Sequence, residues 1–283
     1  MWRGLYKVFR TSFGVISVIT MIVLWSLISY YAISRIADSS SDSDGSYYAE
    51  DCNVYGINLH GDIVTYHTPE SYDQEKVMID QTSADDVMWV MKDAQSNDNI
   101  QAVVVEIDSY GGSGEAGEEM MRLFKDSSKP VVAFIRDAGL SAAYMAATGA
   151  NTIFASKFSN IGSIGVSGSY LQETDKNNKE GLTYVDLSSG KYKDSCDPGR
   201  PLSDDEKAIM MRDIKIGHEN FINIVAQNRN LDVEAVRNIA DGSSVMGEQA
   251  LTDGLIDKIG SLPDVENYLT KKLGEEVNIC WQN

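Results

Sequence analysis

Two short runs rich in β-branched residues, 102–107 and 131–135, constrain the fold of this chain more than any other feature. Neither run shows the apolar and polar alternation of a strand with one wet face, so each predicts a strand buried on both faces. Helical patterns lie beside them, at 84–94 after Ser83 and from the glycine turn at 111–112 through Leu123. Strands that alternate with helices predict an α/β fold with a mainly parallel sheet and covering helices.

The rest of the chain continues this pattern and ends in a mostly helical third. Ser203 is followed three residues later by Glu206, which is a capping-box pattern before a long amphipathic helix. Further expected strands are 54–59, 152–155 and 161–166, and further expected helices are 141–147, 233–239 and 264–273, with the segment 247–259 between the last two.

The N-terminal region predicts a membrane anchor. Residues 11–34 contain no charged side chain and are long enough to cross a bilayer. Basic residues precede this stretch and acidic residues follow it, so the positive-inside rule keeps the N-terminus in the cytoplasm. We therefore expect a cytoplasmic N-terminus (1–10), a transmembrane signal anchor (11–34), a flexible acidic linker (35–51) and an extracytoplasmic domain (52–283). A cleaved secretory signal is the alternative, but the apolar stretch is longer than the usual signal core.

Composition excludes one class of function and leaves another question open. The net charge of −18 at pH 7 argues against nucleic-acid binding, because phosphates require a basic face. The three cysteines, Cys52, Cys196 and Cys280, have no metal-ligand spacing and are expected to be isolated thiols, although one pair could oxidise outside the cell.

The first candidate site is the segment Ile107 to Gly114, where a buried strand ends and a helix begins. Ligands bind at this edge of a parallel sheet, and paired glycines let a backbone N–H approach a substrate oxygen. The segment therefore suits an oxyanion hole. Read alone, it fits an ordinary glycine-rich turn better than a binding site, because it lacks the spacing of a dinucleotide or P-loop motif.

The second candidate is Ser141, which opens a helix of small residues directly after a buried strand. A hydroxyl at a helix N-terminus is favoured as its alkoxide character develops. Read alone, Ser141 fits a helix N-cap better than a nucleophile.

A nucleophilic serine needs a base, and two residue types could supply it. Neither His60, nor His67 in an expected β-hairpin, nor His218 in a long helix lies at the carboxyl end of a core strand, so a Ser-His-Asp triad is poorly supported. Lys191 and Lys193 precede a proline-rich loop. A lysine acts as a base at neutral pH only when burial lowers its pKa from about 10.4.

These motifs together resemble the signal peptide peptidase A family of serine proteases, relatives of Clp protease and crotonase. The matching segments are 108–112, 140–144, 161–166, 189–194 and 245–257, in family order, within a likeness that covers 53–273. The resemblance implies the Clp protease/crotonase-like fold in its short, single-domain form. The sequence of this chain departs from the family at Ala142 and Ala143, where two glycines are usual, and at Ser109-Tyr110, where a serine-proline pair is usual.

Carried over residue by residue, the resemblance assigns Ser141 as nucleophile and Lys193 as general base, and gives Ser163 the role of holding the lysine amine. The turn at Gly111 and Gly112, with the N–H groups of Gly112 and Ala142, forms the oxyanion hole. The resemblance implies a homo-oligomeric ring that degrades remnant signal peptides and other unfolded polypeptides, with no metal or cofactor.

Three alternatives stay open: a related membrane-bound Ser-Lys protease that cuts intact membrane proteins, a crotonase-like acyl-CoA enzyme, and a non-catalytic membrane scaffold.

Overall fold

The computed structural model describes residues 24–27, 29, 52–67 and 80–282. Residues 50–283 form one compact unit, separate from residues 1–49. No helix among the described residues is long and apolar enough to cross a membrane. Most of the expected anchor at 11–34, and all of the expected linker at 35–51, lie outside the described residues.

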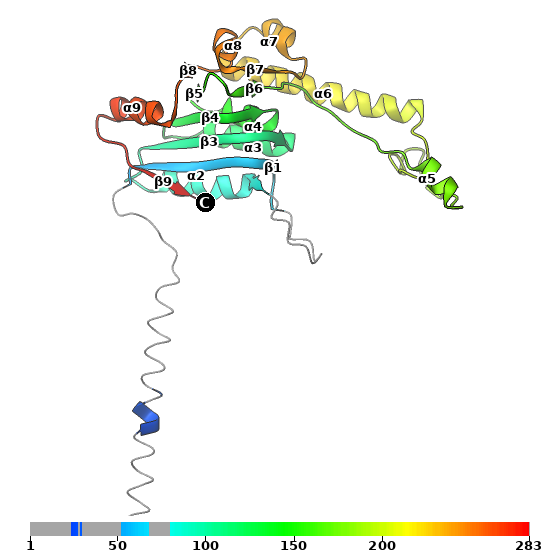
Figure 1. Ribbon diagram of the computed structural model, residues 1–283, viewed down its shortest axis with the longest axis horizontal. Coiled ribbons are helices and arrows are strands. Elements are labelled where there is room, and N and C mark those ends of the chain that lie inside the picture. Colours follow the sequence, from blue (N-terminus) through cyan, green and yellow to red (C-terminus); the bar gives the residue numbers. More distant parts are fainter. Residues whose placement is uncertain (1–23, 28, 30–51, 68–79, 283) are drawn as a thin grey trace, which may run out of the picture. The chain divides into compact units, whose positions relative to one another are not determined.

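The unit is built on a mainly parallel sheet with the strand order β2-β1-β3-β4-β5-β8 (Figure 1). Its central strands are β1 (Val54–Val64), β3 (Ala102–Gly112) and β4 (Val131–Leu140). Shorter strands complete it: β2 (Gln81–Ser83), β5 (Thr152–Ala155), β6 (Asn160–Gly162), β7 (Ser244–Met246), β8 (Lys258–Ile259) and β9 (Ile279–Gln282). Every pairing in the described sheet is parallel except that of β6 with β7.

Both faces of the sheet are buried, as the uninterrupted runs predicted. Val103, Val105 and Ile107 of β3 belong to the larger core, and Val104 between them belongs to a second core on the other face. Because successive side chains of a strand point to opposite faces, a strand covered on both sides is apolar at every position.

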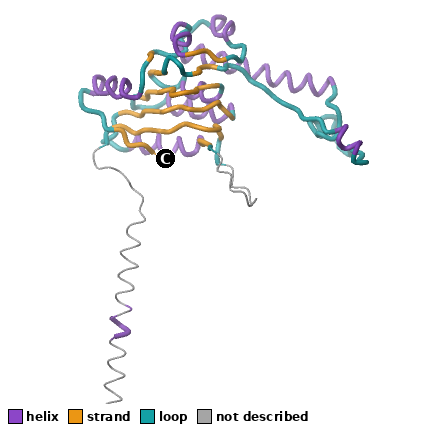
Figure 2. The backbone as a smooth tube through the Cα atoms, in the orientation of Figure 1, coloured by secondary structure: helices purple, strands orange, loops and turns teal. Residues whose placement is uncertain are grey.

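Helices cover these two faces unequally, and Figure 2 shows them in purple beside the orange strands. The larger core is covered by α2 (Ala84–Ser96), α3 (Gly114–Lys125), α4 (Ala142–Ala147), α6 (Asp204–Arg229), α7 (Val233–Ile239) and α8 (Gly247–Thr252). The smaller core is closed by α9 (Leu262–Leu273) through Val265 and Leu269.

Residues 167–203, which we call the arm, connect the sheet to the start of α6 and contain α5 (Thr174–Lys179). Figure 1 shows α5 and the N-terminal half of α6 extending beyond the strands. The predicted capping box is confirmed, because the Ser203 side chain accepts from the Glu206 N–H while the Glu206 carboxylate accepts from the Ser203 N–H.

Two local expectations are wrong, and a third lies partly outside the described residues. The hairpin expected near His67 continues into residues 68–79, which are not described, while the described strands β1 and β2 pair in parallel. The strand expected at 161–166 ends at Gly162, and β3 continues through the glycines at 111–112, where a turn was expected. In both places tertiary pairing, with β1 or with β7, decides where the strand stops.

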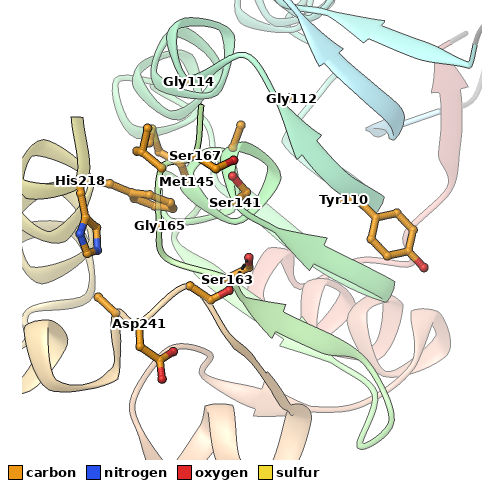
Figure 3. A pocket seen from close by; sticks show the side chains of 15 residues that line it. Tyr110, Gly112, Gly114, Ser141, Met145, Ser163, Gly165, Ser167, His218 and Asp241 are labelled. Atoms are coloured by element: carbon orange, nitrogen blue, oxygen red, sulfur yellow. Dashed lines mark hydrogen bonds between the residues drawn. The ribbon is translucent and has the colours of Figure 1, made fainter. Parts of the chain in front are cut away.

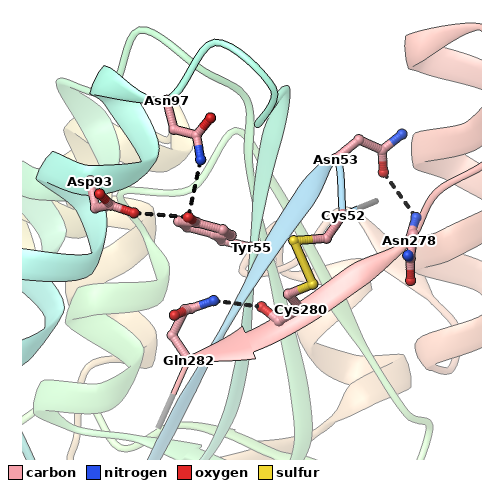
Figure 4. Close-up of a disulfide and its surroundings, with 8 residues drawn as sticks. All are labelled: Cys52, Asn53, Tyr55, Asp93, Asn97, Asn278, Cys280 and Gln282. Carbon is pink, nitrogen blue, oxygen red and sulfur yellow. Dashed lines mark hydrogen bonds between the residues drawn. A yellow bond between two sulfur atoms is a disulfide. The ribbon is translucent and has the colours of Figure 1, made fainter. Parts of the chain in front are cut away.

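A disulfide between Cys52 and Cys280 joins the two ends of the unit (Figure 4). Its partners lie in neighbouring segments because β9 pairs with β1, with Val54 opposite Ile279. Asn53 strengthens the junction, since its side chain accepts from the Asn278 N–H at 2.9 Å. The expectation of isolated thiols is therefore wrong for this pair, while Cys196 is free and exposed.

Candidate active site

Ser141 lies between the end of β4 and the start of α4 in a strained backbone conformation, with φ 51° and ψ −123°. A non-glycine residue rarely adopts a positive φ, and such residues cluster at functional sites. The Ser141 N–H donates to the Gly162 carbonyl at 2.8 Å, which holds the residue in place. Ser141 is the N-cap residue of α4 by position, but within the described residues its side chain makes no capping hydrogen bond.

The helix that follows Ser141 is fixed by a buried tyrosine. All six residues of α4 are buried, and the Tyr144 hydroxyl donates to the Leu255 carbonyl at 2.8 Å. Burial raises the pKa of Tyr144, so this phenol stays neutral and remains a donor. The tyrosine thereby ties the serine segment to the C-terminal segment 245–257.

The end of β3, which holds two glycines, packs directly against Ser141. A Cβ added at Gly111, where φ is +107°, would lie 2.8 Å from the Ser141 Cβ and 3.1 Å from the Ala142 nitrogen. At Gly112 an added Cβ would lie 2.3 Å from the Ile63 carbonyl oxygen. Only glycine fits at either position, and the approach brings the end of β3 against the Ser141-Ala142 peptide.

The hydroxyl of Ser109 fixes the end of β3 through two hydrogen bonds. It accepts from the Gly111 N–H at 3.1 Å and donates to the Gly61 carbonyl at 2.6 Å. Ser109 is buried, so both bonds are shielded from water. The serine thus fixes the conformation from which the glycines approach Ser141.

Ser163 also has a positive φ, 49°, directly after β6. Its N–H donates to the Ser243 carbonyl at 3.0 Å, and its hydroxyl donates to the Gly242 carbonyl at 2.9 Å. A hydroxyl that donates one hydrogen bond keeps its lone pairs as acceptors, so the Ser163 oxygen can still receive a proton donor such as a lysine amine.

These residues line one cavity of about 760 Å³, shown in Figure 3. The structure brings together Ser141, Ala142, Gly112 and Ser163, as the sequence predicted, and Gly111 lies behind Ser141. The remaining walls are mixed in character, with apolar side chains from Met145, Val166, Phe221 and Ala240 and polar side chains from Tyr110, Ser167, His218 and Asp241. A cavity of this size with a serine on its wall can hold several residues of an extended peptide.

Sequence reasoning missed two polar residues of this wall, His218 and Asp241. His218 lies three residues before the buried Phe221, and that helical spacing placed both on one face of α6. The Nε2 atom of His218 is buried and has no hydrogen-bond partner among the described residues. His60 and His67 lie elsewhere, each exposed and 2.5 Å from an aspartate.

The candidate base, Lys193, is in the arm and not in the cavity wall. It is exposed, and its N–H donates to the Gly190 carbonyl at 3.0 Å. Its neighbour Lys191 contacts Asp205, at the first turn of α6, at 2.7 Å. The cavity begins at His218, thirteen residues further along α6, which corresponds to about 20 Å. The contact that holds the lysine segment on α6 is thus well separated from the cavity wall of the same chain.

No cluster of three or more His, Cys, Asp or Glu side chains able to hold a metal ion occurs in the part of the chain that the structure describes.

Comparison with known proteins identifies the family. The model of Peptidase family S49 matches residues 123–276, more than half of the chain, and includes Ser141, Ser163 and Lys193. A protein of Methanocaldococcus jannaschii named as a protease is 32% identical over 192 residues, covering 67% of this chain and 60% of its own. An Enterococcus faecium protein named as the signal peptide peptidase SppA is 32% identical over 199 residues, covering 68% and 58%.

The chain thus spans about 60% of the length of these two relatives. A solved structure of a membrane-bound stomatin-specific protease, 1510-N, in complex with a substrate peptide shares the fold, with a TM-score of 0.50 at 18% identity. That alignment covers 82% of this chain and 93% of the other. The family model, which matches more than half of the chain, shows that the chain belongs to peptidase family S49.

Proposed function

We propose that this chain is a serine endopeptidase in which Ser141 is the nucleophile and Lys193 the general base. The observation that carries the proposal is the conformation of Ser141. Its backbone is strained, and its hydroxyl makes no capping hydrogen bond and lies in the cavity beside Gly112 and Ala142. Strain of this kind persists only where the surrounding structure enforces it. Here the Gly162 carbonyl and the Gly111 approach enforce it.

The proposed mechanism uses four groups. Lys193 removes the proton from the Ser141 hydroxyl as its oxygen attacks a peptide carbonyl, and the N–H groups of Gly112 and Ala142 stabilise the resulting oxyanion. The protonated lysine, held by the Ser163 oxygen, then gives its proton to the leaving amine. Water releases the acyl group from Ser141 through the same lysine.

A second copy of the chain completes this site. Because the arm carries Lys193 away from the cavity of its own chain, we propose that the arm reaches the cavity of a neighbour in a homo-oligomeric ring. Apolar side chains exposed on the arm suit such a contact, notably Leu171, Val185 and Leu187, which are 76%, 68% and 93% exposed.

We further propose that the chain is anchored in the cytoplasmic membrane through residues 11–34, with its catalytic domain outside. The Cys52–Cys280 disulfide supports this placement, because disulfides persist in oxidising compartments and not in the cytoplasm. The substrates we propose are remnant signal peptides and other unfolded polypeptides, in line with the name of the Enterococcus relative.

The test is cleavage of a fluorogenic signal-peptide mimic by the full chain in detergent. Wild type is expected to cut, Ser141→Ala and Lys193→Ala to be inactive, and Lys191→Ala, the matched lysine control, to keep activity. If all variants behave as wild type, the catalytic assignment fails and a non-catalytic scaffold becomes the better interpretation.

Mixing the two inactive variants tests whether the site is shared. If Ser141 and Lys193 come from neighbouring chains, a ring assembled from equal amounts of both variants holds about one intact site in four. We expect about a quarter of wild-type activity from the co-assembled mixture. A mixture that stays inactive, although shown to assemble, would mean that both residues act within one chain.

A further inference from the structure

Besides the ion pair of Lys191 with Asp205, an arginine fastens the segment that carries Lys193 to the start of α6. The Arg200 guanidinium donates to both Glu206 carboxylate oxygens, from Nη1 at 3.0 Å and from Nη2 at 2.6 Å. The same Nη2 donates to the Asp194 carbonyl at 2.8 Å. A planar guanidinium can serve two such acceptors at once, which a lysine ammonium cannot do in the same geometry.

The anchor of this contact is a buried carboxylate. The Glu206 side chain is only 3% exposed, and it also accepts from the Ser203 N–H at 2.9 Å and the Ser203 hydroxyl at 2.6 Å. Hydrogen bonds from Arg200 and Ser203 hold the pKa of Glu206 well below its usual range. The carboxylate is therefore charged at any pH at which the protein works, and α6 presents it at a fixed place.

The other end of the network is the residue next to the candidate base. Arg200 holds the main chain of Asp194, and the Tyr184 hydroxyl donates to the Asp194 carboxylate. Tyr184 itself packs on Gly199, where an added Cβ would lie 2.7 Å from the tyrosine ring. Main chain and side chain of Asp194 are thus both fixed.

The Lys193 side chain contrasts with its fixed surroundings. Lys191, two residues earlier, forms an ion pair with Asp205. Within the described part of the chain, the Lys193 amine has no hydrogen bond or ion pair, although the main chain of its neighbour Asp194 is held by Arg200. The Lys193 amine is thus available to enter the active site of a neighbouring chain. Because its backbone is already fixed, little further conformational entropy of the loop is lost when it does so.

We propose that Arg200 is a positioning residue for Lys193, with Glu206 as its anchor. The proposal rests on the function proposed above, because it gives Arg200 a task only if Lys193 is the base. Without Arg200 the 184–200 loop stays attached to the chain, but Lys193 no longer reaches the nucleophile at one defined place.

The test compares the full chain with Arg200→Gln, Arg200→Lys and Tyr184→Phe. The matched control is Arg212→Gln, an arginine on α6 whose partner Asp213 is exposed. For Arg200→Gln we expect kcat to fall about 10- to 100-fold, the size of loss that a misplaced catalytic group causes. KM should stay within about twofold of wild type, because the cavity wall begins about 20 Å along α6.

Two further readouts separate positioning from simple loss of structure. A lysine amine is neutral near pH 7 only in a well-defined, buried site, so the acid limb of the kcat profile should move to higher pH in Arg200→Gln. Arg200→Lys should recover only part of the loss, since one ammonium cannot hold both Glu206 and Asp194. Arg212→Gln should match wild type in kcat and pH profile.

The possible outcomes decide between the two proposals. A folded Arg200→Gln variant with wild-type kcat and pH profile would overturn the positioning role, while an inactive Lys193→Ala would leave the proposed function intact. Activity that survives Lys193→Ala would remove both proposals. If Arg200→Gln does not fold, Tyr184→Phe decides the question, since it keeps the Arg200–Glu206 pair. An unchanged kcat in that variant would then count against positioning.

Discussion

Gly117 offers the sharpest test of the geometry around Ser141, because it lies on α3 where that helix touches the serine segment. A Cβ added there would lie 2.7 Å from the Ala142 carbonyl oxygen and 3.0 Å from the Ala142 Cβ. Carbon contacts are ordinarily no shorter than about 3.5 Å. In Gly117→Ala, α4 must therefore move away from α3 by several tenths of an ångström, and Ala142 moves with it.

The expected effects on stability and on activity differ in size. Alanine in a helix is more stable than glycine by about 1 kcal/mol, whereas overpacking a core costs about 1–3 kcal/mol. The net loss of stability is thus about 0–2 kcal/mol, or a fall in Tm of up to about 8 °C. Because Ala142 carries a proposed oxyanion donor, we expect kcat to fall at least about tenfold.

The assay measures kcat with the fluorogenic peptide and Tm by circular dichroism. Gly114→Ala, the same change in the same helix, is the control for stability, since no atom lies within 4 Å of its added Cβ. It should leave Tm unchanged or slightly raised. A Gly117→Ala variant that is as active and as stable as wild type would refute the claim that α3 fixes the serine segment.

Two further predictions concern stability. The disulfide closes a loop between cysteines 228 residues apart, so Cys52→Ser with Cys280→Ser should lower the free energy of unfolding by up to about 5 kcal/mol. Guanidinium denaturation of the double variant, and of wild type with and without reductant, measures this loss. An unchanged free energy of unfolding in both the double variant and the reduced wild type would contradict the prediction. The folded-state pKa of Glu206 is lowered, so its stabilisation is present above the unfolded pKa of about 4.3 and is lost as pH falls below it. Tm measured from pH 7 to pH 3 should therefore fall less in Glu206→Gln than in wild type, and parallel curves would contradict the assignment.

Local patterns were sufficient wherever neighbouring residues determine the structure. Ser83 caps α2 by accepting from the Asp86 N–H, and Ser203 and Glu206 form the capping box of α6, as their spacing indicated. The buried strands β3 and β4 were also predictable, because a sheet covered on both faces requires apolar residues at every position.

Such local patterns could not predict the pairing of strands that lie far apart in the sequence. The strand β9 is only four residues long and pairs with β1, more than 200 residues earlier, so its sequence alone carried no signal. The disulfide depends on that pairing, because it brings the Cα atoms of Cys52 and Cys280 to 5.8 Å. Sequence spacing cannot reveal such proximity.

Some features of the candidate site were likewise predictable from local sequence, whereas others depend on the tertiary structure. The sequence by itself predicted which of the proposed site residues come together, since Ser141, the glycines at 111–112 and Ser163 stand at strand ends that a parallel sheet gathers at one edge. Only the tertiary structure decided that Ser141 is strained and makes no side-chain capping hydrogen bond, that His218 and Asp241 join the cavity wall, and that the Lys191–Asp205 contact beside Lys193 lies about 20 Å along α6 from that wall. The physical reason is that strand ends follow from local pattern, whereas the direction of a 37-residue arm follows from contacts such as Arg200 with Glu206, which form only in the folded chain.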